Sequence, residues 1–180
     1  MKPLKLIMSA FGPYSGETEI DFRALGRSGV YLVCGDTGAG KTMIFDAICF
    51  ALFGEASGDS RNGARSSASL RSDFADPASK TFVELEFSYR GQTYRVKRHP
   101  DYERAKKRGE GTTKEPANAE IELPDGRCIG GVRKVNMQVE ELLGIDANQF
   151  KQIVMLAQGE FRKLLTADTA TREGIFRKLF

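Results

Sequence analysis

Histidine and cysteine are scarce in this 180-residue chain, which holds one histidine and three cysteines. The histidine is His99, and Cys34, Cys49 and Cys128 lie 15 and 79 positions apart, so the chain has no C-x-x-C pair. This inventory excludes a Cys/His zinc cluster and argues against a disulfide framework. It is typical of proteins from a reducing compartment.

Long apolar runs are also missing. Residues 6–11 are too few for the apolar core of a signal peptide, and no stretch approaches the length of a membrane span. Apolar residues make up 41% and charged residues 28% of the chain, which argues against general disorder and against a fibrous fold. We therefore expect a cytoplasmic protein of one domain, or one lobe of a larger assembly, with no membrane partner.

The net charge of +3 is small, but its distribution is uneven. Residues 90–115 contain nine Lys or Arg and four acidic residues, which gives +5 in that segment and −2 in the remainder. A local basic patch on a slightly acidic body favours a polyanionic partner.

The first half of the chain shows three strand patterns followed by one helix pattern. Strands are predicted at residues 4–10, 17–22 and 30–34, and the last of these is a continuous apolar run, as in a strand buried on both faces. Apolar residues at 3.6-residue spacing after residue 42 predict a helix that ends at Gly54. Residues 55–80 have weak periodicity and predict a long surface loop.

The second half predicts a hairpin over 83–98, with its turn at 90–92, and a strand over 119–123. Residues 99–116 are too charged to pack and are expected to form an exposed excursion. An amphipathic helix over 132–143 should end at Gly144. The remaining predictions are a buried strand at 153–156 and helices at 161–165 and 172–180.

One motif carries recognisable chemistry. The pattern G-x-x-x-x-G-K-[ST] of a phosphate-binding loop is matched by Gly35, Asp36, Thr37, Gly38, Ala39, Gly40, Lys41 and Thr42. The glycines allow successive backbone N–H groups to point at a phosphate, and the helix that follows adds its N-terminal amides. Lys41 is expected to bind the β- and γ-phosphates of ATP, and the Thr42 hydroxyl to ligate Mg²⁺.

A second motif of P-loop ATPases is absent. Such enzymes need another apolar strand that ends in Asp, and usually a Glu or Gln that orients the attacking water. The one arguable match, residues 142–146, ends an amphipathic helix and contains a glycine, so we reject it. The chain is therefore expected to hold nucleotide phosphates, with no complete catalytic set of its own.

The chain resembles the SbcC family of bacterial exonuclease subunits over nearly its whole length. The resemblance rests on the phosphate-binding loop and on five further stretches, at residues 10–14 (AFGPY), 20–22 (IDF), 44–54 (IFDAICFALFG), 70–75 (LRSDFA) and 157–165 (AQGEFRKLL). Asp36 is a mild departure, because many relatives have proline at this position.

The resemblance implies an α/β P-loop NTPase fold, the N-terminal lobe of an ABC-type ATPase head, with an additional antiparallel β sub-sheet. Residues 1–180 would be the N-terminal half of that head, ending where a coiled-coil helix starts. Family members are ATPases whose ATP hydrolysis is coupled to exonuclease activity on DNA ends, hairpins and double-strand breaks. The implied partners are the C-terminal half of the same ATPase, a second head, the nuclease subunit SbcD and double-stranded DNA in the nucleoid.

By position, the resemblance also implies roles for two further places in the chain. Gln158 matches a glutamine loop whose side chain reaches Mg²⁺ and the γ-phosphate. The turn at residues 12–15 should lie near the base or ribose of the nucleotide.

The basic segment is the second candidate site. Arg95 and Lys97 project from one face of a predicted strand, and the resemblance implies that DNA crosses this sub-sheet. We expect contacts to DNA backbone phosphates, without base specificity, from Arg95, Lys97, Arg104, Lys106, Lys107 and Arg108.

Two other functions stay open. A small P-loop kinase would begin with a similar loop. Such kinases continue with alternating parallel strands and helices, and the predicted hairpin argues against that arrangement. A DNA-binding module with an idle P-loop is the other alternative, and a nucleotide titration separates it from an ATPase.

Overall fold

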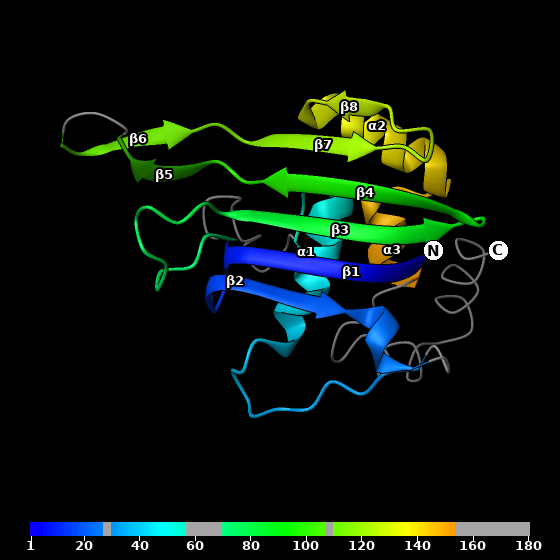
Figure 1. Ribbon diagram of the computed structural model, residues 1–180, viewed down its shortest axis with the longest axis horizontal. Helices are drawn as coiled ribbons and strands as arrows, with labels where there is room; N and C mark the ends of the chain where they lie inside the picture. The colour runs from blue at the N-terminus through cyan, green and yellow to red at the C-terminus, as the bar shows by residue number, and fades with distance from the viewer. Residues whose placement is uncertain (27–29, 57–69, 107–109, 154–180) are drawn as a thin grey trace, which may run out of the picture.

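The computed structural model describes residues 1–26, 30–56, 70–106 and 110–153. Within these ranges, six strands pair antiparallel in the order β2-β1-β3-β4-β7-β8 (Figure 1). The strands are β1 (Lys2–Phe11), β2 (Tyr14–Asp21), β3 (Phe82–Tyr89), β4 (Gln92–His99), β7 (Asn118–Glu122) and β8 (Cys128–Gly130). A short 3-10 helix, η1 (Phe22–Leu25), follows β2.

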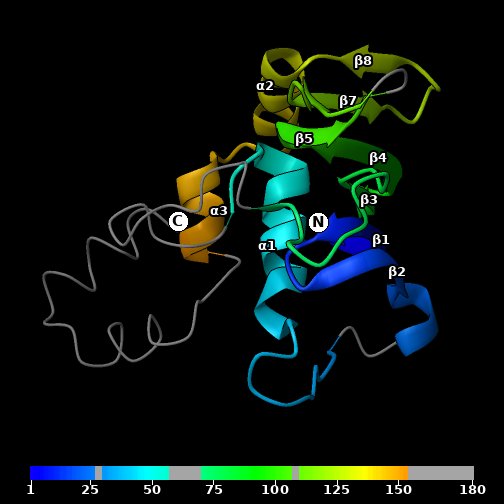
Figure 2. The ribbon, with the colours of Figure 1, turned by 90° about the vertical axis from the view of Figure 1, so that its left-hand side faces the viewer.

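Three helices lie on one face of this sheet, namely α1 (Lys41–Phe53), α2 (Val132–Leu143) and α3 (Ala147–Ile153) (Figure 2). The side chains along each strand alternate between apolar and polar, and this explains why the described helices cover the apolar face of the sheet. In β3, Val83, Leu85 and Phe87 are buried, whereas Glu84 and Glu86 point to the other face. The core therefore forms between the sheet and α1. The α/β class and the antiparallel sheet that the sequence predicted are confirmed.

Most of the other predicted strands and helices are confirmed. The hairpin of β3 and β4, the strand β7 and the helix α2 lie where their patterns placed them. Gly54 and Gly144 end α1 and α2 in the left-handed conformation, and each donates its N–H to a carbonyl of the last turn. Glycine adopts that conformation without steric cost, which is why both helices end there.

The strand predicted at residues 30–34 is wrong. This segment has no regular secondary structure and runs as a loop below the sheet in Figure 1. Val30 and Leu32 are 82% and 88% exposed. A strand buried on both faces needs neighbours whose backbone groups complete its hydrogen bonds, and no described strand pairs with this segment.

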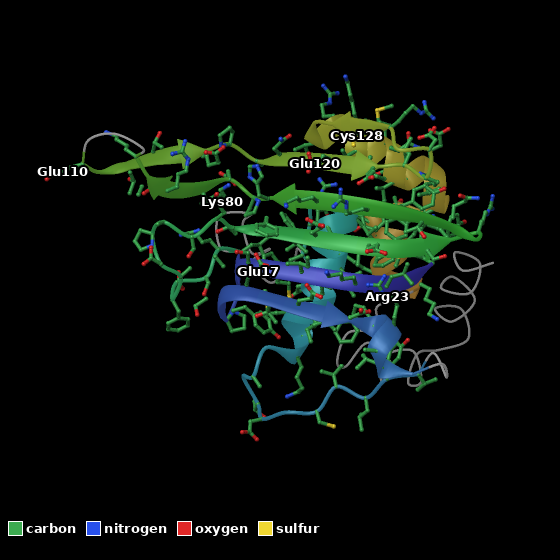
Figure 3. All side chains as sticks on the ribbon, viewed as in Figure 1. Glu17, Arg23, Lys80, Glu110, Glu120 and Cys128 are labelled. Carbon is green, nitrogen blue, oxygen red and sulfur yellow. The ribbon has the colours of Figure 1, made fainter. Side chains whose placement is uncertain are left out.

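The excursion predicted at residues 99–116 is more ordered than expected. It contains a two-stranded sheet of β5 (Tyr102–Ala105) and β6 (Thr112–Glu115), which prolongs β4 and β7 beyond the main sheet (Figure 1). Glu110, labelled in Figure 3, marks its far end. The charged residues that argued against packing form ion pairs here, between Arg104 and Glu115 and between Lys114 and Asp101. We call residues 102–115 the arm.

The C-terminal predictions fall largely outside the described residues. Ile153 ends the helix α3, where the sequence predicted the start of a strand. Residues 154–156 and the two predicted helices that follow are not described. Among the helices that are described, none combines the length and the apolar character needed to cross a bilayer.

Candidate functional site

The glycine-rich loop lies directly before α1. Gly35, Gly38 and Gly40 have φ angles of 155°, 89° and 88°, which L side chains rarely adopt. The Ala39 N–H donates to the Asp36 carbonyl at 3.1 Å, which closes a turn within the loop. Helix α1 then begins at Lys41, so that its N-terminal end lies at this loop. The backbone therefore has the special conformations that the motif required.

Gly40 is also needed for a close approach. A Cβ atom at this position would lie 2.7 Å from Cγ of Pro13 and 3.2 Å from the Tyr14 hydroxyl. The Tyr14 hydroxyl donates to the Gly40 carbonyl at 3.3 Å. Burial raises the pKa of Tyr14, so this phenol stays a donor at neutral pH. The turn between β1 and β2 thus packs directly on the loop.

Lys41 is folded over the loop that precedes it. Its Nζ atom donates to the carbonyls of Gly35 and Asp36 at 2.6 and 2.7 Å. These hydrogen bonds place a full positive charge inside the curve of the loop. An anion that binds there would meet this ammonium group together with the positive end of α1.

A cavity of about 620 Å³ opens beside the loop. It is lined by residues of the loop, the β1–β2 turn, the first two turns of α1 and the segment after residue 70: Gly12, Pro13, Thr37, Gly38, Gly40, Lys41, Thr42, Met43, Asp46, Arg71, Asp73 and Phe74. The structure thus brings five of the eight predicted loop residues to one cavity. Gly35, Asp36 and Ala39 shape the loop without lining the cavity, and Gln158 lies outside the described residues.

Sequence reasoning missed the residues that complete the wall. Asp46 is buried at 5% exposure and follows Thr42 by one helical turn, a spacing that could have revealed it. Arg71, Asp73 and Phe74 belong to the segment predicted as a surface loop. Their signal was the stretch at residues 70–75 that carried part of the family resemblance.

Among the described residues, no three His, Cys, Asp or Glu side chains lie close enough together to hold a metal ion. The cavity nevertheless holds the Thr42 hydroxyl and the Asp46 carboxylate, which are the oxygen ligands that Mg²⁺ prefers. An ion there would need further oxygens, such as those of nucleotide phosphates.

Two basic residues of β4, Arg95 and Lys97, lie on the face of the sheet opposite the described helices, away from the cavity. Arg95 forms ion pairs with Glu122 and with Glu84, the latter at 3.5 Å, and Lys97 lies 3.0 Å from Glu84. The hydrogen bond to Glu122 raises the pKa of Arg95. Glu120, labelled in Figure 3, lies on the same face, so acidic side chains here offset the basic ones.

The arm carries the other predicted DNA contacts. Arg104 is half-buried and pairs with Glu115, whereas Lys106 is exposed. Lys107 and Arg108 lie outside the described residues. Of the six predicted basic residues, the structure therefore describes four: Arg95 and Lys97 on the sheet, where glutamates offset their charge, and Arg104 and Lys106 on the arm.

Arg98, the basic residue of β4 that the sequence analysis left unassigned, is buried at 2% exposure. Its Nε and Nη2 atoms donate to the carbonyls of Ala51 and Leu52, both at 3.1 Å, in the last turn of α1. Burial lowers the pKa of Arg98 to about 10, so the side chain is charged at neutral pH. It joins β4 to the end of the helix that begins at the glycine-rich loop.

The chain is similar to one protein family and to several named proteins. A family model described as an AAA domain matches residues 5–180. Proteins named as the C subunit of the nuclease SbcCD match the whole chain, with 47% identity in Vibrio cholerae, 41% in Staphylococcus aureus strain MRSA252 and 36% in Lactococcus lactis. The chain spans 17–18% of the length of these relatives. Because the family match runs from residue 5 to residue 180 and includes the glycine-rich loop, the chain belongs to the AAA domain family.

Proposed function

We propose that this chain is the ATP-binding N-terminal half of an ATPase head that controls a DNA-processing nuclease. One observation carries the proposal: the loop from Gly35 to Thr42, in glycine-specific conformations at the start of α1, opens on a cavity lined by Lys41 and Thr42. The relatives, whose names make them one component of the SbcCD nuclease, support the assignment to such a complex.

The chemistry of the loop suits a triphosphate. Backbone amides and the positive end of α1 attract phosphate oxygens, and the Lys41 ammonium group adds a full charge. The Thr42 hydroxyl and the Asp46 carboxylate would hold Mg²⁺, with Gln158 as a further predicted ligand. A bound ion would supply positive charge that offsets the negative charge of the phosphates.

The same half would need a partner for catalysis. The sequence contains no apolar strand that ends in a catalytic Asp, and the segment from Val30 to Val33 exposes apolar side chains directly before the glycine-rich loop. Exposed contiguous apolar residues are typical of interaction surfaces. We propose that the C-terminal half of the head covers this segment and supplies the missing groups, and that two such heads dimerise around ATP.

The test is to measure binding and hydrolysis separately. The chain should bind MgATP in an equilibrium titration and show almost no steady-state hydrolysis by itself. Hydrolysis should appear when the C-terminal half is added. Robust turnover by the chain alone would contradict a composite site, and transfer of phosphate to a small metabolite would favour the kinase alternative, which the antiparallel order of the described sheet already disfavours.

We further propose that the head binds the backbone of double-stranded DNA through its basic residues. Lys106 is exposed near the end of the arm, next in sequence to Lys107 and Arg108. Arg95 and Lys97 already pair with glutamates, so DNA phosphates would have to compete with those carboxylates. The arm should therefore contribute more to DNA affinity than the sheet.

Salt dependence measures these contributions in the assembled complex. Replacing Arg104, Lys106, Lys107 and Arg108 with glutamine should reduce the slope of log affinity against log salt by about 0.9 for each DNA phosphate that is no longer neutralised. The pair Arg95→Gln and Lys97→Gln should change it less. Arg133→Gln with Lys134→Gln, on α2, is the matched control, and an unchanged slope in the arm variant would eliminate the arm as a DNA-binding element.

A further inference from the structure

The segment from Leu70 to Ala75 is attached to the end of β1. The Gly12 N–H donates to the Leu70 carbonyl, and the Ser72 N–H donates to the Ala10 carbonyl, both at 2.9 Å. Leu70 and Ser72 are buried at 1% and 3% exposure. The segment is thus fixed beside the same β1–β2 turn that packs on Gly40.

A tight turn follows at once. The Ala75 N–H donates to the Ser72 carbonyl at 3.2 Å, and the Phe74 N–H to the Ser72 hydroxyl at 3.4 Å. Arg71 holds the other side of this loop, since its guanidinium group donates to the carbonyls of Ser79 and Asp76 at 2.9 and 3.0 Å. The backbone on both sides of Phe74 is therefore held in place by hydrogen bonds.

This anchored turn presents an aromatic ring to solvent. Phe74 is 80% exposed although it lines the cavity beside the glycine-rich loop. An exposed phenyl ring gains stability when an apolar surface covers it. The phosphates of a nucleotide cannot provide such a surface, but the flat face of its base can, because aromatic side chains stack on nucleic acid bases.

We propose that Phe74 stacks on the base of the nucleotide whose phosphates bind at Gly35–Thr42, an inference that rests on the proposed nucleotide binding. Pro13 lines the same cavity and is the apolar neighbour from the β1–β2 turn. Stacking is tolerant of base identity, since every base has a π face. The site therefore takes nucleoside triphosphates as a class, and Phe74 adds affinity for the base with little preference between adenine and guanine.

The experiment compares ligands with and without a base in the full chain. MgATP, MgGTP and magnesium tripolyphosphate are titrated into the wild type, Phe74→Ala, Phe74→Trp and Met137→Ala, an exposed apolar side chain on α2 that serves as control. Phe74→Ala should weaken the binding of ATP and GTP about 5- to 150-fold, as expected for stacking of about 1–3 kcal/mol. Its affinity for tripolyphosphate should stay that of the wild type.

Phe74→Trp gives a direct readout, because the chain has no other tryptophan. It should bind ATP as tightly as the wild type, and its fluorescence should change with ATP and GTP and not with tripolyphosphate. Equal losses for all three ligands in Phe74→Ala, or no loss for ATP, would overturn the proposal. A wild type that binds neither ATP nor tripolyphosphate would instead show that the proposed nucleotide binding itself is wrong.

Discussion

Lys41→Ala is expected to lower the affinity for MgATP at least about 100-fold. A hydrogen bond to a charged group contributes about 1.5–3 kcal/mol, and the ammonium group would make two or more to phosphate oxygens. Nζ of Lys41 lies on the loop carbonyls of Gly35 and Asp36, whereas the guanidinium group of Arg71, which also lines the cavity, is held by the carbonyls of Ser79 and Asp76. The measurement is an equilibrium titration with MgATP.

The unfolding free energy should change little in this variant, by less than about 1 kcal/mol, because the two hydrogen bonds of Lys41 are exposed to water. A thermal melt therefore separates loss of binding from loss of structure. Lys134→Ala, on the exposed side of α2, is the matched control and should bind ATP as the wild type does. If Lys41→Ala kept its affinity, the loop would be idle, and the DNA-binding module would be the better hypothesis.

The glycine-rich loop could be predicted because phosphate binding, the function that its motif predicts, leaves little freedom in the choice of residues. A phosphate must be approached by backbone amides, so glycines recur at fixed positions and the helix must follow directly. The conformations of Gly35, Gly38 and Gly40 and the start of α1 at Lys41 agree with that prediction. In this part of the chain, local pattern and three-dimensional structure depend on the same few residues.

The segment at residues 30–34 could not be predicted in the same way. Its apolar run predicts burial, but a strand forms only when other strands pair with it, and Val30 and Leu32 are exposed in the structure. The face of α1 was also uncertain from sequence, because the helix is apolar on most sides. The apolar positions that predict this helix are Ile44, Phe45, Ile48, Ala51 and Leu52. Of these, Phe45 is 46% exposed, whereas Met43 and Phe50, which are not among them, are buried.

The wall of the cavity could not be predicted, because it depends on contacts between distant parts of the chain. Phe74 reaches it because Leu70 and Ser72 pair with β1, some sixty residues earlier in the sequence. No local pattern encodes that pairing. In contrast, the position of Arg98 could have been predicted, because alternation along β4 places it on the same side as the buried Val96.

That buried arginine gives the second large prediction. Arg98→Met is expected to lower the free energy of unfolding by about 3 kcal/mol, since two buried hydrogen bonds from a charged donor are lost and the carbonyls of Ala51 and Leu52 stay buried without them. The positive charge also interacts favourably with the C-terminal end of α1. The cost of burying the guanidinium group, visible in its lowered pKa, offsets part of this gain.

The sign of the pH dependence follows from the same burial. The folded chain binds the Arg98 proton less tightly than the unfolded chain, because burial lowers the pKa of this group to about 10. The contribution of this group to stability therefore rises as the pH increases above about 10, and it is constant at neutral pH, where the group is charged in both states. Arg98→Met should remove that rise, whereas Arg98→Lys should keep one donor and lose less stability.

Arg95→Ala is the matched control for Arg98→Met, because it removes an arginine from the same strand on the exposed face. Its ion pairs with Glu84 and Glu122 lie in solvent, so the expected loss is below about 1 kcal/mol. Denaturant unfolding of the three variants and the wild type measures the difference. If Arg98→Met lost no more stability than Arg95→Ala, the hydrogen bonds to the end of α1 would contribute nothing beyond the cost of burying the charge.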